Sequence, residues 1–252
     1  MAAISNVGLA WDKTGEHFYQ TGVDGVALFV MGTDGTYGAG VAWSGVTAIN
    51  ESPSGADSNK MYADNIEYLN LKSAEEFSFT IEAYQVPQEF DVCDGCPALP
   101  TGTASDASAY SALAAGAVKG HGNERRSFGL VYRVEKGTET NPAGATDKDY
   151  VYHIIYGATA QPSGADHATV NDSPDAVTFS YECDTIPISD ATKLPSTWKK
   201  CSHLEIDASK LTAAQVAELL EQLYGTASGS TLTPPSTLPD PKTLLTAISA
   251  AT

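Results

Sequence analysis

Two of the four cysteines stand close enough together in the sequence to share a chemistry. Cys93 and Cys96 form a C-x-x-C pair in the segment CDGC. A redox pair of this kind needs a strand–helix context, and a zinc site needs a second close pair. Cys183 and Cys201 lie far away in the sequence, and Cys183 falls on the apolar side of a predicted strand. We therefore expect reduced, structural cysteines.

The five histidines are scattered and form no metal-binding motif. His153 lies in an apolar strand pattern, where a hydrogen-bonded core histidine is commoner than a ligand or catalytic base. Residues 91–95 (DVCDG) lack the remaining oxygen ligands and the closing Glu of a calcium loop. Acidic pairs such as Glu75–Glu76 are explained by a solvated surface in a chain this acidic.

Known catalytic motifs are also missing from the sequence. It contains no G-x-S-x-G, no H-E-x-x-H, no P-loop and no G-x-G-x-x-G after a predicted strand. We therefore expect no enzyme active site: no catalytic residues, no cofactor and no bound metal. A structural or binding role is favoured instead.

The charge balance limits the possible partners. The chain has 31 Asp and Glu against 14 Lys and Arg, a net charge of −17. Tight binding to nucleic acid or to an anionic membrane requires clustered cations, so both are disfavoured. No stretch approaches the ~20 apolar residues of a membrane span, and the start (MAAISNVGLAW) does not resemble a secretory signal. We expect folding in a cytoplasm and no membrane contact.

Most of the chain has the pattern of β-strands. Residues 76–84 (EFSFTIEAY) and 127–135 (SFGLVYRVE) alternate between apolar and polar side chains, which predicts half-buried strands. Residues 150–156 (YVYHIIY) and 26–31 (VALFVM) are apolar on both faces, which is typical of central strands. The sequence predicts a mainly β fold, a two-sheet sandwich or barrel.

Two later segments break this pattern. Residues 208–225 carry an apolar stripe that ends at Gly225, which predicts a flanking helix. A Pro/Ser/Thr-rich stretch then leads to a short helix with Asp240 as its N-cap. We therefore expect a β-sandwich domain over 1–225 and a Pro-rich linker with a C-terminal arm over 226–252.

One predicted strand has a similar copy elsewhere in the sequence. Residues 73–87 (SAEEFSFTIEAYQVP) align without a gap with residues 173–187 (SPDAVTFSYECDTIP). Phe79 matches Phe179 and Glu82 matches Glu182 in this alignment. Each copy has an apolar face and a Ser/Thr/Glu face free of Lys and Arg, which suggests equivalent strands in two halves that face each other. Chance similarity between two amphipathic strands is the alternative.

Several longer segments resemble a known family. They include WDKTGEHFYQTGVDGVALF, YADNIEYLNLKSAEEFSFTIEAYQVPQEFDVCDG and IIYGATAQPSGADHATVNDSPDAVTFSYE. Over about residues 11–225 the chain resembles the major tail protein of long-tailed, non-contractile bacteriophages. It departs from that family in the long 97–124 insertion and in Cys96.

This resemblance implies a structural virion protein, located in the phage tail and assembled in the host cytoplasm. Proteins of that family form rings, commonly hexameric, that stack into a tail tube for DNA. One sheet of each subunit joins its neighbours' sheets around the lumen. The implied partners are further copies of the chain, other tail proteins at the tube ends, a tape measure protein in the lumen and passing double-stranded DNA that is not specifically bound.

Together with the repeat, the resemblance predicts three sets of contact residues. The hypothetical lumen-lining residues are Ser78, Thr80, Glu82, Thr178, Ser180 and Glu182. Two segments are candidates for contact between rings, 51–65 and 97–124, and 51–65 is favoured because it leads directly into the repeated strand. The hypothetical inter-ring residues in it are Glu51, Ser54, Asp57, Lys60, Tyr62 and Asp64. The hypothetical contacts of the C-terminal arm with a neighbouring subunit are Leu244, Leu245 and Ile248.

Other classes of protein share the strand pattern. A secreted β-sandwich adhesin or carbohydrate-binding module would also be acidic and rich in strands, but it would usually carry a signal sequence. A tube protein of a contractile tail or of a secretion machine would share the repeat.

Overall fold

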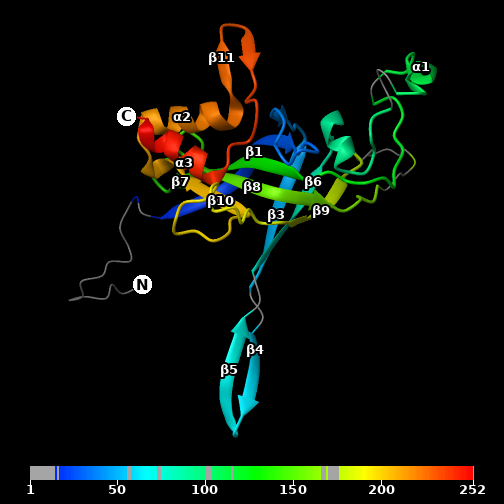
Figure 1. The fold of residues 1–252 in the computed structure, drawn as a ribbon. Coiled ribbons are helices and arrows are strands. Elements are labelled where there is room, and N and C mark those ends of the chain that lie inside the picture. Colours follow the sequence, from blue (N-terminus) through cyan, green and yellow to red (C-terminus); the bar gives the residue numbers. More distant parts are fainter. Residues whose placement is uncertain are drawn as a thin grey trace.

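The computed structural model describes residues 15, 17–55, 58–72, 75–99, 104–114, 116–165, 169 and 176–251. It confirms the predicted fold class, a mainly β sandwich with flanking helices (Figure 1). The strands are β1 (Phe18–Val30), β2 (Val41–Ala42), β3 (Val46–Ser54), β4 (Ser58–Ala63), β5 (Ile66–Lys72), β6 (Glu76–Ala83), β7 (Phe128–Thr138), β8 (Tyr150–Ala160), β9 (Phe179–Thr185), β10 (His203–Asp207), β11 (Thr226–Ser228) and β12 (Thr231–Thr233). The helices are α1 (Ala107–Tyr110), α2 (Ala213–Tyr224) and α3 (Pro241–Ala250), with short 3-10 turns η1 (Gln88–Val92) and η2 (Ala208–Lys210).

The principal sheet is antiparallel throughout and has the order β2-β1-β7-β8-β9-β6-β3, with β10 also paired to β8. Its two halves face each other and share one apolar core. The alternation predicted for β6 supplies one side of that core, because Phe79, Ile81 and Ala83 are all buried. Strands β7 and β8 supply the other side through Leu130 and Ile155.

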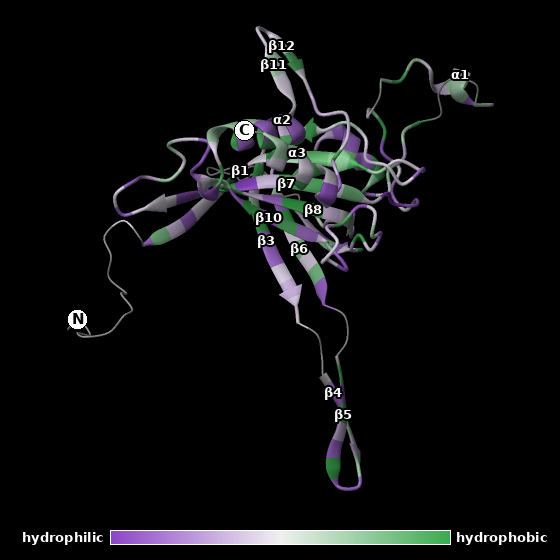
Figure 2. Cartoon of the chain, turned by 60° about the vertical axis from the view of Figure 1, so that its left-hand side comes forward, coloured by the Kyte–Doolittle hydropathy of each residue, from purple (hydrophilic) through white to green (hydrophobic). Residues whose placement is uncertain are grey.

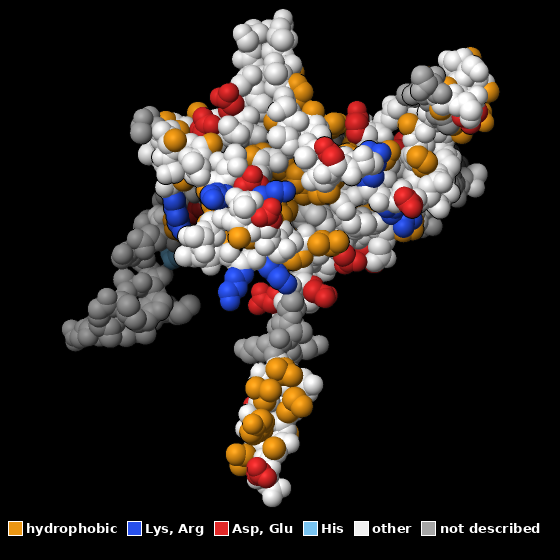
Figure 3. All heavy atoms as spheres, viewed as in Figure 1, with side chains coloured by type: hydrophobic (Ala, Val, Ile, Leu, Met, Phe, Trp, Pro, Cys, Tyr) orange, Lys and Arg blue, Asp and Glu red, His pale blue; other side chains and the backbone are white. Residues whose placement is uncertain are grey.

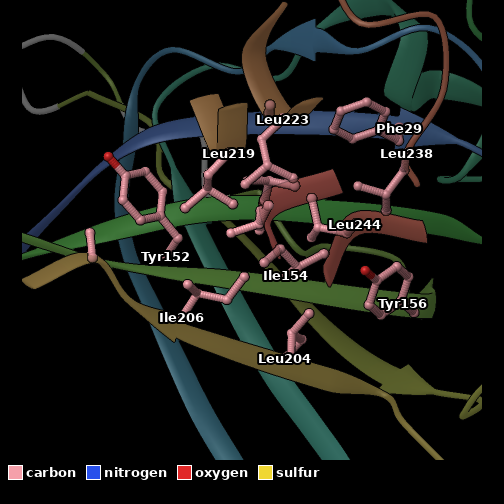
Figure 4. Close-up of a cluster of buried hydrophobic side chains, with 14 of the residues drawn as sticks. Phe29, Tyr152, Ile154, Tyr156, Leu204, Ile206, Leu219, Leu223, Leu238 and Leu244 are labelled. Carbon is pink, nitrogen blue, oxygen red and sulfur yellow. The ribbon is translucent and has the colours of Figure 1, made fainter. Parts of the chain in front are cut away.

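A second core lies on the opposite side of β1, β7, β8 and β10, beneath α2 and α3. Strand β8 is buried along both faces, as its continuous apolar pattern predicts. Figure 4 shows its side chains meeting those of the two helices. The residues labelled there are Phe29, Tyr152, Ile154, Tyr156, Leu204, Ile206, Leu219, Leu223, Leu238 and Leu244.

Both longer helices begin at residues whose side chains cap the first turn. Thr212 and Gln215 form a reciprocal capping box at the start of α2, and Gly225 follows its last residue. Asp240 accepts a hydrogen bond from the Thr243 amide, and Pro241 occupies the first turn of α3. Both predicted helices are therefore present.

The C-terminal segment differs from our prediction that its leucines and Ile248 contact a neighbouring subunit. Leu244 is fully buried and Ile248 is 5% exposed, both in the core beneath α2 and α3, while Leu245 is only partly buried. The first two side chains already have partners within their own chain, so they are not a free contact surface for a neighbour. The expected linker also contains a small hairpin, β11–β12.

The repeated strands are neighbours in the sheet. Strand β6 pairs directly with β9, with Phe79 opposite Cys183 and Thr80 opposite Glu182. This corrects the expectation that the two copies face each other across the sandwich. Part of each copy, residues 73–74 and 173–175, lies outside the described residues.

Strands β4 and β5 form a two-stranded hairpin that projects away from the sandwich, and we call it the arm (Figures 1 and 2). Asp64 and Asn65 form its turn, with φ of 52° and 62°. Positive φ at two successive residues is typical of the type I′ turn, which matches the twist of paired strands. The arm therefore has a defined local geometry. Within the described residues, no helix is long and apolar enough to cross a membrane.

Candidate functional site: an acidic sheet face and an apolar arm

The outer face of β3, β6 and β9 is a continuous polar surface, which we call the polar face. Because side chains alternate along a strand and paired residues point to the same side, the register defines its members. They are Ala48, Asn50, Ser52 and Ser54 on β3, Glu76, Ser78, Thr80 and Glu82 on β6, and Ser180, Glu182 and Asp184 on β9.

The polar face carries negative charge only. Its carboxylates are Glu76, Glu82, Glu182 and Asp184, and no residue of the three strands is Lys or Arg. Hydrogen bonds cross between strands on this side: the Ser78 hydroxyl donates to the Ser52 carbonyl at 2.9 Å. The surface can therefore stay hydrated and repel anions.

The structure brings the predicted lumen-lining residues together. Ser78, Thr80 and Glu82 lie on β6, and Ser180 and Glu182 lie beside them on β9. Thr178 is exposed and comes just before β9 begins.

The polar face ends at an open sheet edge. Strand β3 is the last strand of the order, and within the described residues no strand pairs with its other edge. Such an edge leaves backbone donors and acceptors free to pair with a strand of another chain. The polar face could thus be continued by a neighbouring molecule.

The arm exposes several large apolar side chains. Figure 3 shows hydrophobic side chains gathered along its visible face. The exposed large hydrophobic residues are Met61, Tyr62, Ile66, Tyr68, Leu69 and Leu71. An isolated hairpin in water is marginally stable, and contiguous exposed apolar surface marks an interaction site. The arm therefore has the character of a surface that a partner covers.

The predicted inter-ring residues are divided between two environments. Lys60, Tyr62 and Asp64 lie on the arm, where Lys60 forms an ion pair with Glu67 at 2.9 Å. Ser54 ends β3, and Asp57 lies outside the described residues. Glu51 differs from the others, because it is on the inner face of β3 opposite Phe79.

Glu51 reaches a polar cluster between the two halves of the sheet. Its carboxylate accepts a hydrogen bond from the Tyr132 hydroxyl, and its Oε1 lies 3.2 Å from His153 Nδ1. The hydrogen bond from His153 lowers the pKa of Glu51 to about 2, although partial burial opposes this shift. His203 completes the cluster, and burial lowers its pKa.

Sequence reasoning did not find this cluster. It identified His153 as a core histidine, but Glu51, His153 and His203 come from three strands that are distant in the sequence. Only the pairing of β8 with β10 and the closure of β3 over them bring the three side chains together.

The cysteines are all unpaired and buried, as we predicted for structural thiols. Burial raises the pKa of the Cys93 thiol to about 12, so this thiol stays protonated at neutral pH. Cys96 Sγ lies 3.1 Å from His121 Nδ1, and Asp94 is also close to that ring. This group lies in the loop region before β7.

Comparisons with known proteins add little to this picture. No protein-family model matches the chain, and no curated protein matches it. Among solved structures, the chain is similar to one in the cryo-EM structure of the anti-feeding prophage (AFP) baseplate, 6-fold symmetrised. The TM-score is 0.31 and the identity is 7%, over 81% of this chain and 100% of that chain. A likeness at this level carries no argument about function.

Proposed function

We propose that this chain is a structural subunit of a bacteriophage tail tube, not an enzyme. Copies join side by side into rings, which we expect to be hexameric, and the rings stack into a tube through which DNA passes. The observation that carries the proposal is the polar face: an acidic, cation-free sheet surface that ends at an open edge. A ring of subunits joined through such edges would have no free edges left.

The charge of the polar face suits a lumen for DNA. Each Lys or Arg in contact with a phosphate adds affinity through counterion release, so several together would hold the duplex. Carboxylates such as Glu82 and Glu182 repel the duplex instead and keep it moving. We infer that the virion tail is the location of the assembled protein, with a tape measure protein in the lumen and other tail proteins at the tube ends.

The arm supplies a second kind of contact in this proposal. Its apolar residues would be covered by an adjacent ring, and the hairpin would be stabilised by that contact. This role rests on the exposure of residues such as Met61 and Leu69, which are paired on one face of the hairpin.

Electron microscopy tests the proposal. Untagged protein is concentrated and imaged by negative stain, and rings or tubes are the expected result. The double variant Met61→Ser with Leu69→Ser should weaken ring stacking, because it removes a cross-strand pair of exposed apolar side chains from the arm. The control is Asn70→Ser, which changes a polar position of the same hairpin. Dispersed monomers under all assembly conditions would contradict the proposal.

A carbohydrate-binding module is a second candidate, and one observation favours it. Tyr62 and Tyr68 are strongly exposed near the turn of the arm, where aromatic rings could stack on sugars. Two results together would support this second function over the first. The protein would bind glycans on an array and lose that binding in Tyr68→Ala, and it would form no rings.

A further inference from the structure

The strongest unexplained feature lies at one end of the space between the two halves of the sheet. There the apolar core gives way to Glu51 on β3, His153 on β8 and His203 on β10. His153 Nδ1 lies 3.0 Å from His203 Nε2 and 3.2 Å from Glu51 Oε1, and His203 Nε2 lies 3.8 Å from the same oxygen. Three potential metal ligands therefore converge on one point.

From this geometry we propose that Glu51, His153 and His203 bind a divalent transition-metal ion of the zinc type. Metal–nitrogen and metal–oxygen bonds near 2.0–2.2 Å place neighbouring ligand atoms of a tetrahedral site about 3.4 Å apart. The observed separations lie on both sides of that value. Two imidazoles with one carboxylate form a known ligand set for zinc, whereas Mg²⁺ and Ca²⁺ prefer oxygen ligands alone.

The surroundings of the cluster hold the ligands in place. The Tyr132 hydroxyl donates to the Glu51 carboxylate, as outer-shell partners of metal ligands commonly do. The Tyr132 ring stacks on His153 with centroids 4.7 Å apart, and the Phe77 ring stacks on His203 at 4.6 Å. Each ligand lies on a β-strand, so little conformational entropy is lost when an ion binds.

An ion can also reach the cluster. A surface groove of about 660 Å³ is lined by Glu51, His153 and Tyr132, together with Glu205. Glu205 lies opposite His153 in the β10–β8 pair, so a second carboxylate stands at the entrance. The groove would leave the fourth coordination position of a bound ion open to solvent.

The bound ion would connect the two halves of the sheet. Glu51 belongs to the half that carries the polar face, and both histidines belong to the half covered by the helices. Glu51 also lies only a few residues before the arm. Metal binding would thus fix β3 against the strands β8 and β10.

Untagged protein, freed of metal by a chelator and dialysed, is titrated with Zn²⁺ by calorimetry, and the retained metal is measured by mass spectrometry. We expect one tightly bound ion per chain and a rise in the unfolding midpoint of roughly 5–10 °C at about 100 times the dissociation constant. Glu51→Gln and His203→Gln should each weaken binding by at least about 100-fold, because each removes a direct ligand.

The control variant is Asp94→Asn with Cys96→Ser, which disables the other cluster of metal-ligand types, Asp94, Cys96 and His121. Unchanged Zn²⁺ binding in that variant supports the proposal. Loss of binding there, with full binding in Glu51→Gln, would overturn it. Absence of tight Zn²⁺ binding by the unmodified protein would also overturn it.

Discussion

The two outer faces of the sandwich differ in what covers them. The outer side of β8 carries Tyr152, Ile154 and Tyr156, and helices α2 and α3 bury all three. The outer side of β6 carries Ser78, Thr80 and Glu82, and none of these is buried by the chain. Both strands contribute apolar residues to the shared core, so the two strands differ in their outward positions.

This contrast teaches that the exposed face is specified by the sequence. A helix does not pack on a strand whose outward positions are polar, because burying hydroxyls and carboxylates without hydrogen-bond partners raises the free energy of the folded state. The covered face should therefore tolerate truncation poorly, and the polar face should tolerate substitution well. Three predictions test this difference.

The largest effect is expected on the covered face. Leu244→Ala should lower the free energy of unfolding by about 2–5 kcal/mol, because it leaves a cavity in a fully buried site. Chemical denaturation measures the change. Leu245→Ala is the matched control at a partly exposed position and should cost clearly less. Equal losses at the two positions would mean that α3 does not pack as described.

A smaller effect is expected at the start of α3. Asp240 accepts a hydrogen bond from the Thr243 amide at 3.0 Å, so Asp240→Ala should cost about 1 kcal/mol. Asp240→Asn keeps an N-cap acceptor and should be close to the unmodified protein. A full loss in the Asn variant would show that charge, and not the cap, is responsible.

The smallest effect on stability is expected on the polar face. The pair Glu82→Lys and Glu182→Lys should each change the free energy of unfolding by no more than about 0.5 kcal/mol, since both side chains are on the solvent side of the sheet. The same pair should give the protein a salt-dependent affinity for duplex DNA, measured by electrophoretic mobility. The control, Glu82→Gln with Glu182→Gln, adds no cation and should bind far less DNA.

The sequence was sufficient to predict the faces of the strands but not their neighbours. The alternation at Phe79 and Thr80 predicted correctly which side is buried, since period two is a local property. The direct pairing of β6 with β9 was not predicted, because an amphipathic pattern is compatible with either sheet of a sandwich. For α3, the local sequence around Asp240 predicted the N-cap. The burial of α3 was not predicted, because it depends on packing against α2 and no local sequence pattern reports that contact.

The arm was only partly predicted. The sequence predicts a contact segment over residues 51–65, whereas in the structure residues 51–54 end β3 and the hairpin runs from Ser58 to Lys72. The apolar residues of this hairpin are exposed, whereas apolar residues in a strand usually predict a buried face. The cluster of Glu51, His153 and His203 was missed because periodicity carries no information on which distant strands meet.

The order of the sheet also has a consequence for how the chain folds. Strands β3 and β6 are joined by the arm and can pair as one local hairpin, whereas Phe18 pairs with Thr138 and Ser78 with Asp184. Contacts between such distant residues form slowly, because the intervening chain must first be closed into a loop. The β3–β6 hairpin can therefore form before β7 and β8, which supply the other side of its apolar core, have been synthesised. A hairpin whose apolar side has no cover exposes hydrophobic surface, which favours aggregation of the growing chain.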